Sequence, residues 1–71
     1  MDEKTQTHID NIRSKDKALQ NQAYTYLLKK TEIPVDWAYD VWDGLVEGLH
    51  HKDNHVRSIS AQILANLAKS E

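Results

Sequence analysis

The sequence lacks cysteine, which excludes disulfides and thiolate metal sites. It has one proline and two glycines, so it has no glycine-rich loop of the kind that cradles phosphate. No apolar run approaches the roughly 18 residues of a membrane-spanning helix, and polar residues rather than an apolar signal core follow Met1. Nine Lys and Arg against eleven Asp and Glu give a formal charge of -2, which argues against non-specific electrostatic binding to nucleic acid or anionic membranes. We therefore expect a soluble, cytoplasmic protein.

The chain is short, and its length limits its hydrophobic core. Its 71 residues suffice for one small domain, 1–71, of a size that buries only about 60% of the surface exposed by the unfolded chain. Disulfides, a usual support of small domains, are excluded. We expect marginal stability for an isolated copy, with extra core supplied by a neighbour.

A first helix is expected to begin near Thr5 or Thr7, because either hydroxyl can cap free backbone N–H groups. Asp10 follows Thr7 by three residues, as in a capping box. Only Ile9 and Ile12 mark the buried side of this helix.

A second helix is expected after the polar turn, with Asp16 or Ser14 as its cap. It should end near residues 29–31, where two lysines suit the negative end of the helix dipole. Its expected buried positions are Leu19, Ala23, Tyr26 and Leu27.

Pro34 interrupts the helical pattern, because it has no N–H and disfavours helical geometry at the residue before it. We expect a linker over 31–36 and a third helix from about Asp36. Gly44 and Gly48 lie inside this helix, each at a cost of about 1 kcal/mol relative to alanine. Close approach of another helix would explain both glycines. The apolar side of this helix consists of Ala38, Val41, Trp42, Leu45, Val46 and Leu49.

The last helix is expected to begin at Asp53 and to carry the clearest apolar stripe of the chain. The stripe has the spacing i, i+3, i+4, i+7, i+8, i+11, which buries one face of a helix of 3.6 residues per turn. Its residues are Val56, Ile59, Ser60, Ile63, Leu64 and Leu67.

The two halves of the chain align with each other at an offset of 37 residues without a gap. Apolar positions then meet apolar positions, and Asp16 falls on Asp53 at the start of each second helix. A period in this range is typical of helical hairpins that stack as repeats. We predict an all-α fold of four helices in two stacked antiparallel hairpins, over 5–31 and 36–69.

The segment Asp53-Asn54-His55-Val56-Arg57, followed by Ser60, Ala61 and Leu64, resembles the HEAT repeat family. The resemblance covers 8–31 and 45–68 and implies a fragment of a HEAT-like α-α superhelix, or α-solenoid. It further implies that Asp53 caps the helix, that Val56, Ser60 and Leu64 are core, and that Arg57 contacts the adjacent unit. The first unit departs from the pattern, because Gln20 stands where the arginine should be.

Catalysis and metal binding have no support in the sequence. In the stretch from His50 to His55, the expected helix start at Asp53 separates His51 from the last histidine, so the spacing does not give a zinc site. Four acids line one side of the third helix without a nucleophile or an oxyanion donor. We predict neither enzyme activity nor a cofactor. The four acids are Asp36, Asp40, Asp43 and Glu47.

The architecture favours a protein-interaction scaffold that binds a partner through its second-helix face or stacks on copies of itself as an oligomer. The chain ends where a next unit would begin, which is consistent with a piece of a longer array. A nucleic-acid-binding module is the alternative, since the turns carrying Arg13, Lys15, Lys17, His50 and Lys52 lean basic. The candidate interaction residues are Asn21, Thr25, Trp37, Arg57, Gln62 and Asn66.

Overall fold

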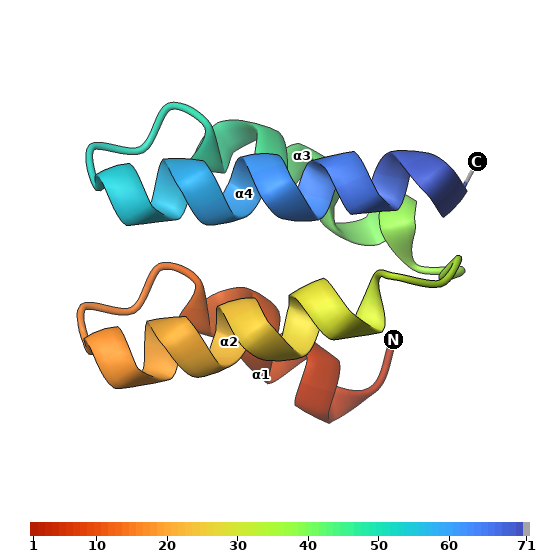
Figure 1. Ribbon diagram of the computed structural model, residues 1–71, viewed down its shortest axis with the longest axis horizontal. Helices are drawn as coiled ribbons and strands as arrows, with labels where there is room; N and C mark the ends of the chain where they lie inside the picture. Colours follow the sequence, from red (N-terminus) through yellow and green to blue (C-terminus); the bar gives the residue numbers. More distant parts are fainter. Residues whose placement is uncertain (71) are drawn as a thin grey trace.

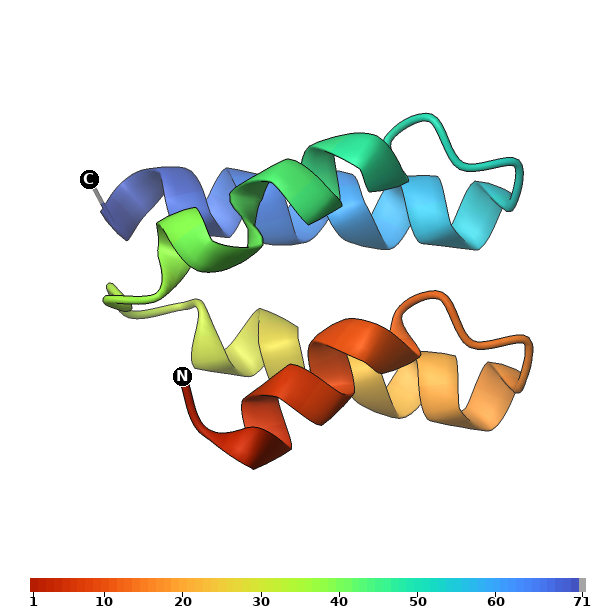
Figure 2. The same ribbon diagram turned by 180° about the vertical axis from the view of Figure 1, so that it is seen from behind.

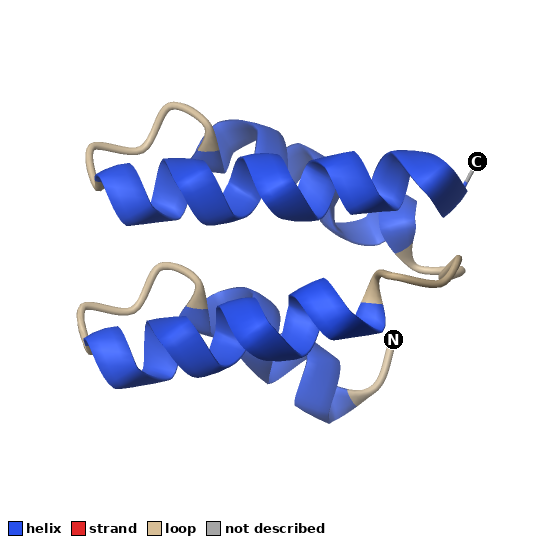
Figure 3. Cartoon of the chain, viewed as in Figure 1, coloured by secondary structure: helices blue, strands red, loops and turns tan. Residues whose placement is uncertain are grey.

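The computed structural model describes residues 1–70, and the side chains of 1–69. These residues form four α-helices, a final 3-10 turn and no strand (Figure 3), which confirms the predicted all-α class. No helix among them is long and apolar enough to cross a membrane. The elements are α1 (Glu3–Asn11), α2 (Lys17–Lys30), α3 (Ala38–Gly48), α4 (Asn54–Leu67) and η1 (Ala68–Ser70).

The helices pack in consecutive pairs, α1 on α2 and α3 on α4, and the two pairs meet mainly through α2 and α4. Figure 1 shows α2 and α4 side by side on one face, and Figure 2 shows α1 and α3 on the other. Both turns within a pair, 12–16 and 49–53, lie at one end of the molecule, and the linker 31–37 crosses at the opposite end. This arrangement places the N-termini of both second helices at the same edge.

Two aspartates begin the second helices, as the sequence predicts. Asp16 accepts hydrogen bonds from the backbone N–H groups of Ala18 and Leu19. Asp53 accepts the corresponding bond from His55 at 2.8 Å. Each carboxylate thus satisfies N–H groups that have no partner within the helix.

The predicted start of the first helix is wrong. Asp2 is the cap of α1 and accepts a hydrogen bond from the backbone N–H of Thr5 at 2.8 Å. Thr5 is instead buried against α2, with its hydroxyl 3.3 Å from that of Tyr26. Thr7 lies within the helix, so it does not form the expected capping box with Asp10.

One hydrophobic core runs through both pairs of helices. The predicted stripe of α4 is its largest contribution, with four apolar residues and Ser60 buried. Trp37 is also buried, at the start of α3. The core consists of Ile12, Ala23, Leu27, Trp37, Ala38, Val41, Leu45, Val56, Ile59, Ile63 and Leu67.

Leu19 and Val46 do not join this core, although the sequence pattern predicts that both are buried. Leu19 is 40% exposed, whereas Val56, its counterpart at the offset of 37, is 1% exposed. The hydroxyl of Tyr24 on α2 donates a hydrogen bond to Gln62 on α4, so this side of α2 faces the second pair. Leu19 lies five positions before Tyr24, which is a rotation of about 140° around the helix axis. Leu19 therefore faces away from the second pair. Val46, which is 37% exposed, lies on the side of α3 opposite Gly44, whose carbonyl meets Arg13 of the first pair.

The explanation offered for the two glycines holds only for Gly48. A Cβ built on Gly48 would meet the side chain of Ser60, so α3 and α4 approach closely there. A Cβ on Gly44 would meet nothing within 4 Å. The carbonyl of Gly44 instead accepts a hydrogen bond of 2.6 Å from Arg13 across the two pairs of helices.

Candidate functional site

A groove runs between α2 and α4 on the face formed by the second helices. It encloses about 450 Å³, within the range of small-molecule and side-chain pockets. We call it the α2/α4 groove. It is lined by Lys17, Gln20, Asn21, Tyr24, His55, Ser58, Ile59 and Gln62.

The deep part of the groove is apolar and held in place by buried contacts. Ile59 is 8% exposed and belongs to the core, and Tyr24 packs against the core as a half-buried residue. The side-chain amide of Gln20, which is 3% exposed, donates to the carbonyl of Ile12 at 3.0 Å. Because this amide is bonded and buried, the methylene groups of Gln20 form a fixed wall.

The rim of the groove carries exposed amides and a hydroxyl. The Tyr24 hydroxyl donates to Gln62 Oε1 at 2.7 Å and ties α2 to α4. The amide nitrogen of Gln62 lies 3.4 Å from Ser58 Oγ, a long hydrogen bond. Asn21 and Ser58 stand on opposite sides of the groove. Such groups can bond to the backbone of an extended peptide, which has one donor and one acceptor per residue.

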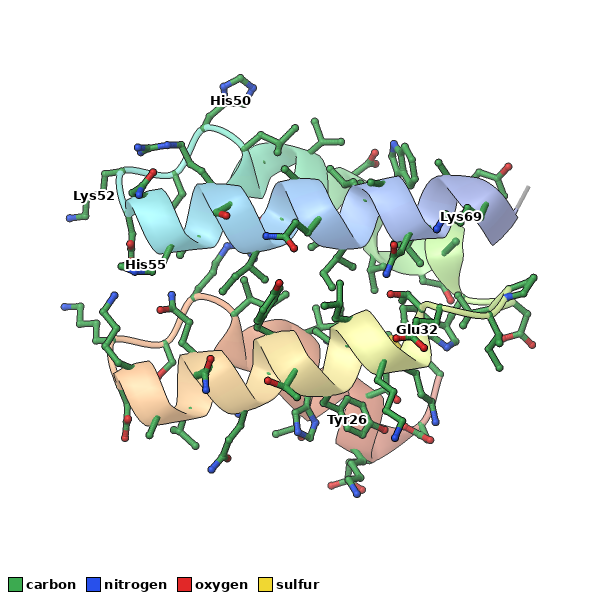
Figure 4. All side chains as sticks on the ribbon, in the orientation of Figure 1. Tyr26, Glu32, His50, Lys52, His55 and Lys69 are labelled. Atoms are coloured by element: carbon green, nitrogen blue, oxygen red, sulfur yellow. The ribbon has the colours of Figure 1, made fainter. Side chains whose placement is uncertain are left out.

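The turn end of the groove is basic. Lys17 Nζ pairs with Asp53 Oδ2 at 3.2 Å, from the first pair of helices to the second. Figure 4 shows His55 pointing from the start of α4 toward α2, with Lys52 in the adjacent turn. The helix amide of His55 and then the ammonium of Lys17 hold the pKa of Asp53 well below its usual range.

Acid is expected to destabilise the fold through the two cap carboxylates whose pKa values are lowered. Hydrogen bonds from the side chain and backbone of Thr5 lower the pKa of Asp2, and the bonds to Asp53 act in the same direction. A lowered pKa in the folded state adds stability that is complete above the unfolded pKa of about 3.9 and is lost as the pH falls below it. We predict that the free energy of unfolding, measured with urea, decreases from about pH 5 downward.

The variant Asp53→Asn is the control for this pH dependence. Asparagine still caps a helix well but has no charge to titrate, so its stability should decrease less steeply with acid than that of the wild type. Equal slopes for the two proteins would contradict the assignment.

The structure brings two of the predicted interaction residues together in the groove and places the others elsewhere. Asn21 and Gln62 line the groove from α2 and α4. Thr25 is exposed one turn further along α2 and lines a second hollow of about 550 Å³ beside the linker. Asn66 is half-buried, and its amide donates to Thr31 Oγ1 at 3.0 Å, so it joins α4 to α2.

The structure corrects the roles predicted for Arg57, as a contact to the adjacent unit, and for Trp37, as a surface interaction residue. Arg57 donates to the carbonyl oxygens of His51 and Lys52 at 2.7 and 3.1 Å, in the turn of its own pair of helices. It therefore holds the α3–α4 turn rather than an adjacent unit, and the ion pair between units is formed by Lys17 and Asp53. Trp37, the residue before α3, is 7% exposed and belongs to the hydrophobic core, so it is not available as a surface contact.

Sequence reasoning missed Lys17, Tyr24, Ser58, Ile59 and His55 as lining residues of one groove. The available signal was their position, because each of them lies on one of the two second helices. What the sequence could not supply is the neighbouring helix, because the hollow exists only between α2 and α4.

The histidine-rich turn and the acidic residues near α3 do not form a metal site in the described part of the chain. His51 Nδ1 accepts a hydrogen bond from the backbone N–H of Asp53 at 3.0 Å and so belongs to the turn. Within residues 1–70, no three His, Asp or Glu side chains gather as a metal site. Asp40, Asp43 and Glu47 on α3 are exposed, as is Asp36, which lies in the linker before α3 rather than in the helix.

Comparison with known proteins gives no relative. No family model, no curated protein and no solved structure matches the chain.

Proposed function

We propose that this chain is a non-catalytic, HEAT-like interaction scaffold that binds a protein segment in the α2/α4 groove. The observation that carries the proposal is the groove itself, an apolar hollow with an amide rim between two second helices. The HEAT-like interpretation draws further support from the parallel placement of α2 and α4 and from the Asp caps that begin both helices. Helical repeats commonly use such a surface to bind partners.

The proposal is tested by selecting binders from a random peptide display library and mapping them on the protein by NMR chemical-shift changes. Peptides should perturb residues of the α2/α4 groove. The variant Asn21→Trp, which places a large side chain in the groove, should weaken their binding roughly tenfold.

Gln22→Trp is the matched control, since Gln22 is the next residue of α2, is exposed and does not line the groove. It should bind the selected peptides as the wild type does. Selected peptides that map outside the groove, or that tolerate Asn21→Trp, would contradict the proposed site.

Self-association is a second mode of the same scaffold, and one observation favours it. Leu27 is fully buried in the first pair of helices, whereas Leu64, its counterpart in the second pair at the offset of 37, is only half-buried. On α3 of the second pair, Val46 is exposed and Trp42 is half-buried. A second copy packed against the second pair would complete the core. Sedimentation that shows a stable monomer at low micromolar concentration would contradict self-association.

The alternative is a nucleic-acid-binding module that uses the two basic turns, and the proximity of these turns at one edge favours it. However, two of the five Lys and Arg side chains at this edge already donate hydrogen bonds to backbone carbonyls. Arg13 donates to Gly44, and Arg57 donates to His51 and Lys52. Because nucleic-acid affinity depends on neutralising several phosphates, we prefer a protein partner.

A further inference from the structure

Charge is distributed unevenly along the molecule, and the lining of the α2/α4 groove extends to its positive end. Residues 12–17 and 49–57 contain five Lys and Arg but only two Asp, a net charge of +3, while the rest of the chain carries -5. Both segments lie at the turn end (Figure 1). The protein as a whole is acidic, so this basic edge is a local property of the fold.

The two acids at this edge do not cancel its positive charge for a ligand. Asp16 accepts hydrogen bonds from the first N–H groups of α2, and Asp53 does the same in α4. Asp53 also pairs with Lys17, yet the side chain of Lys17 remains 61% exposed. Both helix N-termini point to the same edge and add positive potential there.

The groove next to this edge has room for an apolar side chain. Its deep part is formed by Ile59 and Tyr24, and its rim by Asn21, Ser58 and Gln62. At the turn end it is lined by Lys17 and His55. A ligand that matches both parts has an apolar side chain with carboxylates beside it.

From this juxtaposition we infer that the α2/α4 groove selects acidic peptide segments, with an apolar side chain against Ile59 and Tyr24 and carboxylates at Lys17, Lys52 and His55. The inference rests on the proposed scaffold function and names the class of partner. Nucleic acid offers the same negative charge but no aliphatic side chain for the apolar hollow, so the hollow favours peptide.

Matched synthetic peptides test this selectivity. One has a central leucine flanked by glutamates, a second has glutamines in their place, and a third has lysines. Titrations followed by NMR should show the glutamate peptide binding in the groove roughly three to ten times more tightly than the glutamine peptide. The lysine peptide should bind most weakly.

Two variants that each remove one positive charge test whether the preference for the glutamate peptide comes from the basic edge. Lys17→Gln should reduce the advantage of the glutamate peptide several-fold, whereas Lys69→Gln, near the opposite end of the molecule (Figure 4), should leave it unchanged. Circular dichroism establishes that both variants are folded. Equal effects of the two substitutions would overturn the assignment to the basic edge.

The outcomes separate this inference from the scaffold proposal. Equal binding of the glutamate and glutamine peptides in the groove would overturn the inference and leave the scaffold standing. Absence of groove binding by these peptides and by library-selected peptides would overturn both. Salt-sensitive binding of duplex DNA at residues 12–17 and 49–57, with no binding of the glutamate peptide, would replace the peptide partner with nucleic acid.

Discussion

Replacing Leu27 with alanine is expected to lower the free energy of unfolding by about 2–5 kcal/mol. Leu27 is fully buried in the core, and the truncation leaves a cavity that neighbouring side chains fill only in part. A loss of this size is a large fraction of the total stability of a small domain. Urea unfolding followed by far-UV circular dichroism measures the change.

Leu19→Ala provides the control within the same helix. The chemical change is identical, but Leu19 is 40% exposed and lies on the side of α2 away from the second pair of helices. We expect a loss of less than about 1 kcal/mol, since less apolar surface leaves the core. Similar losses at the two positions would contradict the arrangement of the helices, because they would mean that both leucines are buried.

Gly48→Ala is expected to lower the free energy of unfolding by about 1–3 kcal/mol, although alanine favours a helix by about 1 kcal/mol over glycine. Gly48 is buried where α3 crosses α4. The new Cβ would lie 3.0 Å from Ser60 Cβ and still closer to the hydroxyl oxygen, so the Ser60 side chain must turn away and its Cβ must move back slightly. Thermal unfolding of the variant and the wild type gives the comparison.

Gly44→Ala, four residues earlier in α3, is expected to have the opposite sign. Its Cβ would meet no atom within 4 Å, so the gain in helix propensity remains and raises stability by up to about 1 kcal/mol. Removing the side chain of Ser60 should relieve the effect of Gly48→Ala and not that of Gly44→Ala. A neutral or stabilising Gly48→Ala would contradict the close contact of α3 with α4.

Features that depend on a residue and its own helix could be read from the sequence. Asp16 and Asp53 cap the second helices as predicted, because a cap needs only a short acceptor and the N–H groups next to it. The buried stripe of α4 was predicted for the same reason, from spacing alone. Pro34 lies in the linker between α2 and α3, as its missing N–H requires.

The candidate groove was predictable only in outline. The second-helix face was expected as a binding surface, and Asn21 and Gln62 lie on it. The hollow itself depends on Tyr24 and Ile59, which meet across α2 and α4 from distant parts of the chain. The ion pair of Lys17 with Asp53 is equally non-local. It joins the two pairs of helices, a role that the HEAT resemblance implied for Arg57, whereas Arg57 bonds to the turn of its own pair.

The sequence by itself determined the presence of four helices, the Asp caps of the two second helices and the apolar stripe on each second helix. Tertiary structure decided which side of each stripe is covered, and this is why Leu19 is exposed while Val56 is buried. The physical reason is that the second pair of helices covers one side of α2, whereas the first pair covers the opposite side of α4. Equivalent positions in the two repeats therefore face different surroundings. Helical periodicity records that a face is apolar, but only the packing of the pairs shows what lies against it.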